Sequence, residues 1–478
     1  MSATTKHFIG GDWRAGAGPT MTDLNPSTGK TLAEFPIGTA DEVDAAVRSA
    51  RDAFDGGWRD STPTVRRRLL LRLAELIGER APDLARIATE DMGMPVAFTH
   101  GEALWATEIL EYYAGWADKL NGETIPLSAA NTLDYTIRQP RGVVAAIVPW
   151  NSPLSLALWR MAPALAAGNA LVLKPSELAP LPILGLMDLI AEAGFPAGVV
   201  NCVTGSGPET GAALVDHPGV DVVGFTGSSA TGRRVAEAAA RRLIPVSLEL
   251  GGKSANVVFA DADLDAAAIQ ACVGCFVNTG QQCIAGSRLL VQETIHDEFM
   301  EKVTAFALTF TVGDPMQPTT QMGPLISAPQ LERVLGFIDE ARAGTSIALG
   351  GERLGGDLAD GYFVPPTVVT GVRPEMRIAR EEIFGPVLSV ITFRDEAEAI
   401  AIANDTEYGL AGGVWTKDLS RAHRVARAID AGTVWVNAWL ALNAQAPFGG
   451  FKASGLGTEG GREALDVYLQ TKNVYVQL

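Results

Sequence analysis

Cys283 is the residue of this sequence best suited to act as a nucleophile. It lies in a short segment between Gly280 and Gly286, directly after a run with helical spacing. Glycines let a backbone approach a ligand closely, and a cysteine needs a base, a cation or a helix dipole to ionise at neutral pH. Taken alone, the segment fits a small buried hydrophobic residue equally well.

A carboxylate that could activate water, Glu249, ends an apolar run and is followed by Gly251 and Gly252. In doubly wound α/β folds, the carboxyl ends of the strands line the ligand crevice. A half-buried carboxyl group there has a raised pKa, which suits a general base. The alternative is a surface glutamate at a turn, which the apolar neighbours disfavour.

Polar groups also follow two other predicted strands. Asn151 lies between Pro149 and Pro153, where its amide N–H could stabilise an oxyanion. On its own, that segment fits a helix cap better. Lys174 and Glu177 could hydrogen-bond a ribose diol, and on their own they fit a solvated turn.

A glycine-rich dinucleotide motif of the form G-x-G-x-x-G does not occur in the sequence. Gly227 and Ser228 instead precede a predicted helix that has Gly232 in its first turn. The N-terminus of a helix can hold a phosphate group, and the same residues also fit a plain helix cap.

Composition narrows the class of protein. A chain of 478 residues predicts two or three domains. The net charge of −17, without a basic stripe, argues against a nucleic-acid partner. The basic runs at 66–68, 233–234 and 241–242 are expected on solvated helix faces. No segment predicts a membrane span and residues 1–10 predict no secretory signal, so we expect a cytoplasmic protein.

The four cysteines are too few for a disulfide framework. Cys272 and Cys275 form a C-x-x-C pattern, but their neighbours are apolar at helical spacing and no second pair completes a metal site. We therefore expect a buried helix here and predict no metal.

The elements that must position these residues follow from hydrophobic periodicity. Helices are predicted at 41–56, with a capping box from Thr39 and Glu42, after Pro63, and at 101–118. Strands at 143–148, 170–174, 199–203, 220–225 and 244–248 alternate with helices at 153–167, 181–193, 208–216 and 229–242. This alternation predicts βαβ units and a parallel sheet.

A second alternating region follows Gly252. Its strands are predicted near 255–259, 288–292, 387–393, 412–416 and 433–437. Residues 123–140 alternate like a hairpin, and the tail 473–478 alternates as well. An apolar strand needs a sheet edge to pair with, so we expect an oligomerisation element; a private ribbon on the monomer is the alternative.

Together these segments resemble the aldehyde dehydrogenase superfamily over nearly the whole chain. Further matching motifs lie at 8–13, 381–387, 404–410, 432–437, 447–452 and 454–455. The resemblance implies an α/β fold with three parts. They are a Rossmann-like cofactor domain (1–121 and 141–251), an α/β catalytic domain (252–467) and a β-ribbon for oligomerisation (122–140 and 468–478) of a homodimer or homotetramer.

The resemblance also implies roles. Cys283 resembles the nucleophile that forms a thiohemiacetal and then a thioester. Asn151 resembles the oxyanion donor, working with the backbone N–H of Cys283, and Glu249 resembles the base that activates water. The positions implied for the cofactor are Ile147, Pro149, Trp150, Lys174, Ser176, Glu177, Gly207, Phe225, Gly227, Ser228, Leu250, Gly251, Glu382 and Phe384.

The positions implied for the substrate pocket are Ser152, Trp159, Gln282, Ile284, Leu442 and Phe448. Ser152 and Leu442 stand where the family often has aromatic residues, so a medium-sized or aromatic aldehyde is expected. No arginine occupies the matched catalytic-loop positions, which disfavours an acidic semialdehyde. Thr458 stands where the family often has arginine, and nothing in the sequence explains that change.

Three alternatives stay open at this point. A CoA-acylating relative typically lacks the hydrolytic glutamate that Glu249 matches. A thiol hydrolase needs a Cys–His pair, and the five histidines lie in no such motif. A structural or binding member would have lost Cys283 or Glu249. For the cofactor, Glu177 should repel a 2′-phosphate, which favours NAD while leaving NADP possible.

Overall fold

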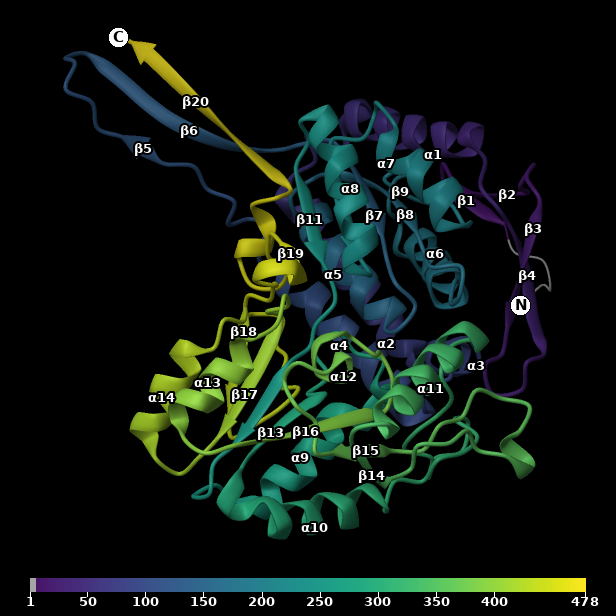
Figure 1. Ribbon diagram of the computed structural model, residues 1–478. Helices are drawn as coiled ribbons and strands as arrows, with labels where there is room; N and C mark the ends of the chain where they lie inside the picture. The colour runs from purple at the N-terminus through teal and green to yellow at the C-terminus, as the bar shows by residue number, and fades with distance from the viewer. Residues whose placement is uncertain (1–5) are drawn as a thin grey trace.

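The computed structural model describes residues 6–478 (Figure 1). Between residues 143 and 249, apolar strands alternate with helices, and the strands form the first sheet. Its parallel strands are β7 (Val143–Ile147), β8 (Ala170–Lys174), β9 (Val200–Cys202), β10 (Val222–Thr226) and β11 (Val246–Glu249). The helices between them are α5 (Pro153–Ala166), α6 (Leu181–Ala193), α7 (Ala212–Asp216) and α8 (Ser229–Arg242). The predicted parallel sheet is confirmed; the helix expected at 208–216 begins as a π-helical turn at Gly207–Gly211.

The strand order β19-β11-β10-β7-β8-β9-β1-β2 makes this sheet doubly wound. The chain moves from β7 to β9 in one direction and then returns to place β10 on the other side of β7. The edges are antiparallel additions from distant sequence: β1 (His7–Ile9), β2 (Asp12–Arg14) and β19 (Gly455–Leu456). The domain boundary predicted after residue 251 stays a prediction. Strand β19 comes from the part of the chain after this boundary, yet it pairs with β11 in the first sheet.

The N-terminal segment adds a hairpin and a layer of helices. The hairpin is β3 (Thr20–Leu24) and β4 (Thr31–Pro36), and the helices are α1 (Ala40–Ala53), α2 (Pro63–Glu79), α3 (Ala81–Met92) and α4 (Val96–Ala114). The capping box of Thr39 and Glu42 is present. Residues 1–5, the start of the segment in which no signal is expected, lie outside the described residues. No helix within residues 6–478 is both long and apolar enough to cross a membrane.

The second region forms a seven-stranded sheet that is parallel except for its edge strand β14, and Figure 1 shows it below the first. Its strands in spatial order are β14 (Ser346–Leu349), β15 (Thr367–Thr370), β16 (Val387–Phe393), β13 (Arg288–Gln292), β12 (Ala255–Val258), β17 (Ala411–Trp415) and β18 (Thr433–Val436). Its longer helices are α9 (Leu264–Phe276), α10 (His296–Ala307), α11 (Ala328–Arg342), α13 (Glu396–Asn404) and α14 (Leu419–Ala428). The sequence missed β14 and β15.

Successive residues of the second sheet's strands enter different cores because side chains alternate across a sheet. Val257 and Leu290 join the cluster that includes residues of α11 and α14. Val258 and Leu289 join the cluster that includes residues of α9 and α10. Both faces are therefore covered, as an almost wholly parallel sheet requires.

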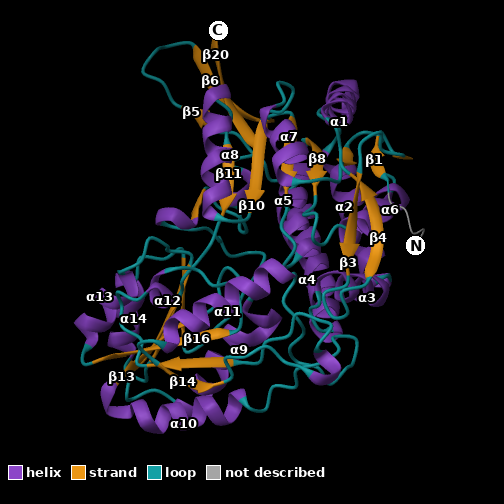
Figure 2. Cartoon of the chain, turned by 45° about the vertical axis from the view of Figure 1, so that its right-hand side comes forward, coloured by secondary structure: helices purple, strands orange, loops and turns teal. Residues whose placement is uncertain are grey.

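The predicted hairpin and tail come together as a three-stranded antiparallel ribbon. It consists of β5 (Thr124–Ile125), β6 (Thr132–Pro140) and β20 (Leu469–Gln477). The ribbon projects from the body in both views (Figures 1 and 2).

Arg66 departs from the sequence-based expectation. Its side chain was predicted to be solvated, but only 8% of the residue is exposed. The guanidinium turns inward from α2 and donates to the Ser61 carbonyl at 2.6 Å. The physical reason is register: Val65, Arg67 and Arg68 occupy the exposed positions on either side of it.

Candidate active site

The carboxyl ends of β7, β8, β10 and β11 meet at one edge of the first sheet. Lys174 and Glu249 end β8 and β11, while Asn151 and Gly227 directly follow β7 and β10. The reversal of strand order between β7 and β10 opens a crevice at this edge. The remaining predicted cofactor positions on this sheet lie at the same strand ends or in the loops after them: Ile147, Pro149, Trp150, Ser176, Gly207, Phe225, Ser228, Leu250 and Gly251.

A cavity of about 240 Å³ lies between this edge and the loop before β13. All three predicted catalytic residues, Cys283, Glu249 and Asn151, line it. The six predicted pocket residues line it as well: Ser152, Trp159, Gln282, Ile284, Leu442 and Phe448. The structure thus brings together residues that are up to about 300 positions apart in the chain.

A strained turn sets the position of Cys283. Asn278 and Thr279 adopt left-handed conformations with φ of 52° and 55°, which are uncommon for residues other than glycine. The Asn278 amide donates to the Asn151 carbonyl at 2.8 Å, and the Asn151 amide donates to the Gln281 carbonyl at 3.0 Å. These bonds lock the nucleophile's loop to the end of β7.

The helix-cap interpretation of this segment, with Ser or Asn as the cap, is confirmed only in position. Ser152 is the N-cap of α5, but its side chain makes no capping bond. The Glu102 carboxylate on α4 accepts the Ser155 backbone N–H at 3.0 Å instead. Asn151 lies outside the helix, and it lines the cavity together with Cys283.

Burial controls the ionisation of Cys283. It raises the pKa of the thiol to about 12, and the negative charges of Glu382 and Glu249 act in the same direction. The thiol of the cofactor-free protein is therefore protonated at neutral pH. A thiolate would require a compensating positive charge at the site.

Glu249 is buried rather than lying on a surface turn, so that alternative is wrong. Neither carboxylate oxygen has a hydrogen-bond partner among the described residues. Burial raises the pKa of this carboxyl group well above its usual range; the Glu459 charge raises it further and the Arg160 charge opposes the rise. A buried carboxyl group with a raised pKa suits a general base.

The loop after β8 carries a buried ion pair. Lys174 Nζ lies 3.1 Å from Glu177 Oε2, and Lys174 is only 2% exposed. The interpretation as a solvated turn is therefore wrong. Burial alone would raise the pKa of Glu177, but the Lys174 charge and the hydrogen bonds from Lys174 and from backbone N–H groups together keep the pKa below its usual value. The charged carboxylate can accept hydrogen bonds from a ribose.

Glu382 faces the same edge from the second sheet's side. It accepts the Gly252 backbone N–H at 3.0 Å, and burial raises its pKa to about 7. A Cβ added to Gly251 would lie 2.4 Å from a Glu382 oxygen, so a side chain there would displace the Glu382 carboxylate. Phe384 has a φ of 61° and its ring lies edge-on to Trp150, with centroids 5.4 Å apart.

Ser228 is the N-cap of α8, where its side chain accepts the Thr231 backbone N–H at 3.3 Å. The first backbone N–H groups of a helix lack partners within the helix, and those of α8 start beside the crevice. The capping role and the phosphate-binding role are compatible here. Together with the Lys174–Glu177 pair and the Glu382–Gly252 hydrogen bond, these donors and acceptors fit a dinucleotide cofactor.

Comparison with known proteins matches this arrangement. The sequence model of the aldehyde dehydrogenase family matches residues 13–474. The chain belongs to the aldehyde dehydrogenase family. It is 47% identical over 474 residues to an aldehyde dehydrogenase of Aspergillus niger, covering 98% of this chain and 95% of the relative.

Other relatives carry a more specific name. Betaine aldehyde dehydrogenase 1 of Oryza sativa subsp. japonica is 44% identical over 476 residues, covering 98% of this chain and 94% of the relative. The structure of betaine aldehyde dehydrogenase from Staphylococcus aureus in complex with NAD+ has a TM-score of 0.97 at 40% identity, covering 100% of this chain and 95% of that one.

Two charged residues at the site of this aldehyde dehydrogenase family member escaped the sequence analysis. Arg160 and Glu459 are buried and paired at 2.7 Å. Arg160 also donates to Thr226 Oγ1 at 2.7 Å, and Ser247 donates to Glu459 at 2.8 Å. The signal for Arg160 was a lone arginine inside an otherwise apolar helix. Glu459 has no local signal, because its partner lies 299 positions away.

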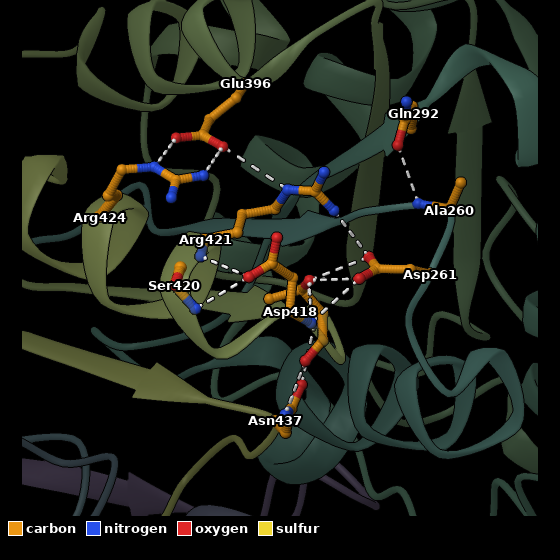
Figure 3. Close-up of polar contacts among 10 residues, drawn as sticks. Ala260, Asp261, Gln292, Glu396, Asp418, Ser420, Arg421, Arg424 and Asn437 are labelled. Atoms are coloured by element: carbon orange, nitrogen blue, oxygen red, sulfur yellow. Dashed lines mark hydrogen bonds and ion pairs between the residues drawn. The ribbon is translucent and has the colours of Figure 1, made fainter.

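Hydrogen bonds at the carboxyl ends of the second sheet's strands hold the loop that follows β18, and Figure 3 shows Asn437 among these contacts. Asn437 exchanges two hydrogen bonds of 3.0 Å with the backbone of Thr416, whose hydroxyl donates to Asp261 at 2.8 Å. Two residues later, Trp439 Nε1 donates to the Ile284 carbonyl at 3.2 Å, next to the nucleophile. The same loop then supplies Leu440 and Leu442 to the cavity.

Proposed function

We propose that this protein oxidises an aldehyde to its carboxylic acid, with NAD as the hydride acceptor. The observation that carries the proposal is the single cavity lined by the Cys283 thiol, the Asn151 amide and the Glu249 carboxyl group. Family membership and the relative solved with NAD+ support it.

In the first step the Cys283 thiol loses its proton to solvent, the sulfur attacks the aldehyde carbon, and the carbonyl oxygen becomes an oxyanion. The Asn151 amide and the backbone N–H of Cys283 donate to this oxyanion. NAD held along the first sheet's edge would supply the hydride acceptor for the tetrahedral carbon. After hydride loss the carbon–sulfur bond remains as a thioester on Cys283.

In the second step Glu249 takes a proton from water, and the water oxygen attacks the thioester carbon. The carbon–sulfur bond breaks, Cys283 leaves as a thiolate and the acid is released. Burial raises the pKa of Glu249, which makes its carboxylate a stronger base for this proton transfer. The Glu459 charge raises this pKa further, while the Arg160 charge lowers it.

The cofactor preference rests on Glu177. Burial opposes ionisation, but the Lys174 charge and several hydrogen bonds together lower its pKa, so the carboxylate is charged at neutral pH. A charged carboxylate accepts from a free 2′-hydroxyl and repels a 2′-phosphate. We therefore infer that NAD is preferred over NADP.

The cavity wall indicates the substrate class. Trp105, Trp159 and Phe448 form a chain of rings with neighbouring centroids 5.1 Å apart. The cation that lines the cavity, Arg160, is already paired with Glu459. A neutral aldehyde of medium size or with an aromatic ring fits this lining best.

We infer that the protein is a homo-oligomer and that its three parts are the predicted cofactor domain, catalytic domain and ribbon. On the ribbon, Leu133, Ile137 and Tyr475 are exposed, as is Val436 on the edge strand β18 of the second sheet. Exposed apolar side chains on strand edges favour pairing with a second copy. Light scattering after size exclusion tests this part of the proposal.

The deciding measurement is NADH formation, followed by near-ultraviolet absorbance with NAD or NADP and a panel of benzaldehyde, hexanal, acetaldehyde and betaine aldehyde. We expect turnover with NAD that Cys283→Ala abolishes, while Cys272→Ala, a buried cysteine outside the cavity, retains it. Turnover that needs coenzyme A would instead indicate an acylating enzyme. Tight NAD binding without reduction of any cofactor would indicate a non-catalytic member.

A further inference from the structure

A second concave surface lies away from the cavity, where the base of the ribbon meets α1 and α2. This arginine groove has a volume of about 800 Å³. Six cationic residues and three carboxylates line it: Arg51, Arg59, Arg66, Arg138, Arg141 and Lys472, with Asp55, Asp60 and Asp118. The ribbon supplies Arg138 from β6 and Lys472 from β20, while the body supplies Arg66 from α2.

Half of these cations already have carboxylate partners. Arg51 pairs with Asp221, and Arg138 pairs with Asp466. Arg59 pairs with both Asp55 and Asp60. These pairs consume two of the three carboxylates on the wall, and the third, Asp118, pairs with Lys119 outside the groove.

The other three cations, Arg66, Arg141 and Lys472, form no ion pair with any carboxylate of residues 6–478. Arg66 is more than nine-tenths buried, and its Nε atom has no hydrogen-bond partner; the same is true of the Nε atom of Arg138. Arg141 uses only its Nε atom, which donates to the Val467 carbonyl at 2.9 Å. The terminal nitrogens of Arg141 therefore face the groove without an acceptor, and the Nε atoms of Arg66 and Arg138 lie buried in its wall without one.

The positive charges that line the arginine groove repel one another. Burial lowers the pKa of Arg66. Burial lowers the pKa of Arg141 too, and the neighbouring Arg138 charge lowers it further. An anion between these side chains would remove the repulsion and satisfy the free N–H groups. The planar guanidinium fork matches the oxygens of a phosphate group in particular.

We propose that the arginine groove binds a small anion bearing a phosphate group, held by Arg66, Arg138, Arg141 and Lys472. Because these residues come from both the body and the ribbon, the bound anion ties the ribbon to the body. The site is independent of the proposed aldehyde oxidation and lies outside its cavity.

Calorimetric titration with inorganic pyrophosphate at constant ionic strength tests the site, in the presence and absence of saturating NAD. NAD fills the phosphate-binding part of the cofactor crevice, so heat that persists reports the groove. We expect saturable binding that weakens at least tenfold in Arg141→Gln and in Lys472→Gln. Arg373→Gln, an exposed and ion-paired arginine of the second region, is the matched control and should bind like the wild type.

The proposal is supported if the two groove variants bind both orthophosphate and pyrophosphate more weakly than the wild type does. The ratio of the two affinities then shows whether the site prefers a single phosphate group or a diphosphate. Equal binding by wild type and groove variants overturns it. So does an absence of pyrophosphate binding combined with a changed oligomeric state of the variants, since a carboxylate of a second copy would then fill the groove.

Discussion

The carboxyl edges of the two large sheets are built alike but filled differently. In each sheet the order of strands reverses once, between β7 and β10 in the first and between β12 and β17 in the second. A ligand crevice is expected at both points. The first edge is lined by glycines and potential ligand groups. At the second edge, Asp261, Thr416, Asp418 and Arg421 bond to one another (Figure 3).

The helix N-termini show why the two edges differ. Asp418 caps α14 by accepting from the backbone of Ser420 and Arg421, and Asp395 caps α13. A carboxylate in that position already neutralises the positive end of the helix. Ser228 caps α8 without a charge, so a phosphate group can still bind there. The side chains, rather than the fold, decide which edge takes a ligand.

The second sheet contributes to the cavity from its opposite end. Cys283 precedes β13, so the proposed nucleophile comes from the amino end of these strands and meets the carboxyl end of the first sheet. The filled edge serves instead as the anchor for Asn437 and the loop that follows it. The comparison therefore predicts that substitutions at the first edge reduce catalysis and that substitutions at the second mainly reduce stability.

The largest effect is expected for Glu249→Gln at the first edge. Without the base, the thioester should form but hydrolyse slowly, so kcat should fall by about 10²- to 10⁴-fold. A burst of NADH equal to the enzyme concentration should remain in stopped-flow absorbance. Loss of the burst together with turnover would place Glu249 in the first step instead.

The next effect concerns the pH dependence of Cys283. Because its pKa is raised to about 12, the thiolate fraction of the cofactor-free protein should grow about tenfold per pH unit between pH 6 and 9. Iodoacetamide alkylation of the Cys283 peptide, followed by mass spectrometry, should show that slope. Glu382→Gln removes a negative charge, lowers the thiol pKa and should speed alkylation at pH 8. A plateau below pH 8 in the wild type would contradict this prediction.

At the second edge, Asp261→Asn should lower stability rather than turnover. It weakens the acceptor of the Thr416 hydroxyl and the Arg421 guanidinium. Loss of such bonds costs about 1–3 kcal/mol, which should appear as a Tm lowered by a few degrees in calorimetry. We expect kcat to stay within about twofold of the wild type, and a kcat loss as large as that of Glu249→Gln would break the comparison.

The smallest effect is expected for Arg424→Ala. Arg424 bonds to Glu396 through two nitrogens, each at 2.8 Å, but more than half of its side chain is exposed. Exposed ion pairs contribute about 0–1 kcal/mol. The Tm shift should be near the limit of detection and should vanish in 0.5 M salt. A larger Tm shift than that of Asp261→Asn would show that the hydrogen bonds of Glu396, rather than those of Asp261, stabilise the second edge most.

Buried parallel strands were the part of the fold most readable in the sequence. The bounds of β8, β13 and β16 match their predicted ranges because both faces of such strands are covered, so each strand is mostly apolar and stands out from the polar loops beside it. The two-residue strand β19 gave no such signal, because its pairing with β11 depends on a contact across about 200 residues. The strands β14 and β15 were missed in the same way, being short and near a sheet edge.

By itself, the sequence determined the family, the order of βα units and the types of residue that line the cavity, because local periodicity and motif spacing encode them. Tertiary structure alone decided which charges are buried together. Arg66 and Lys174 are buried, and Arg160 forms a buried ion pair with Glu459. Burial, and with it every shifted pKa at this site, depends on residues that are distant in the chain, so no local sequence pattern predicts it.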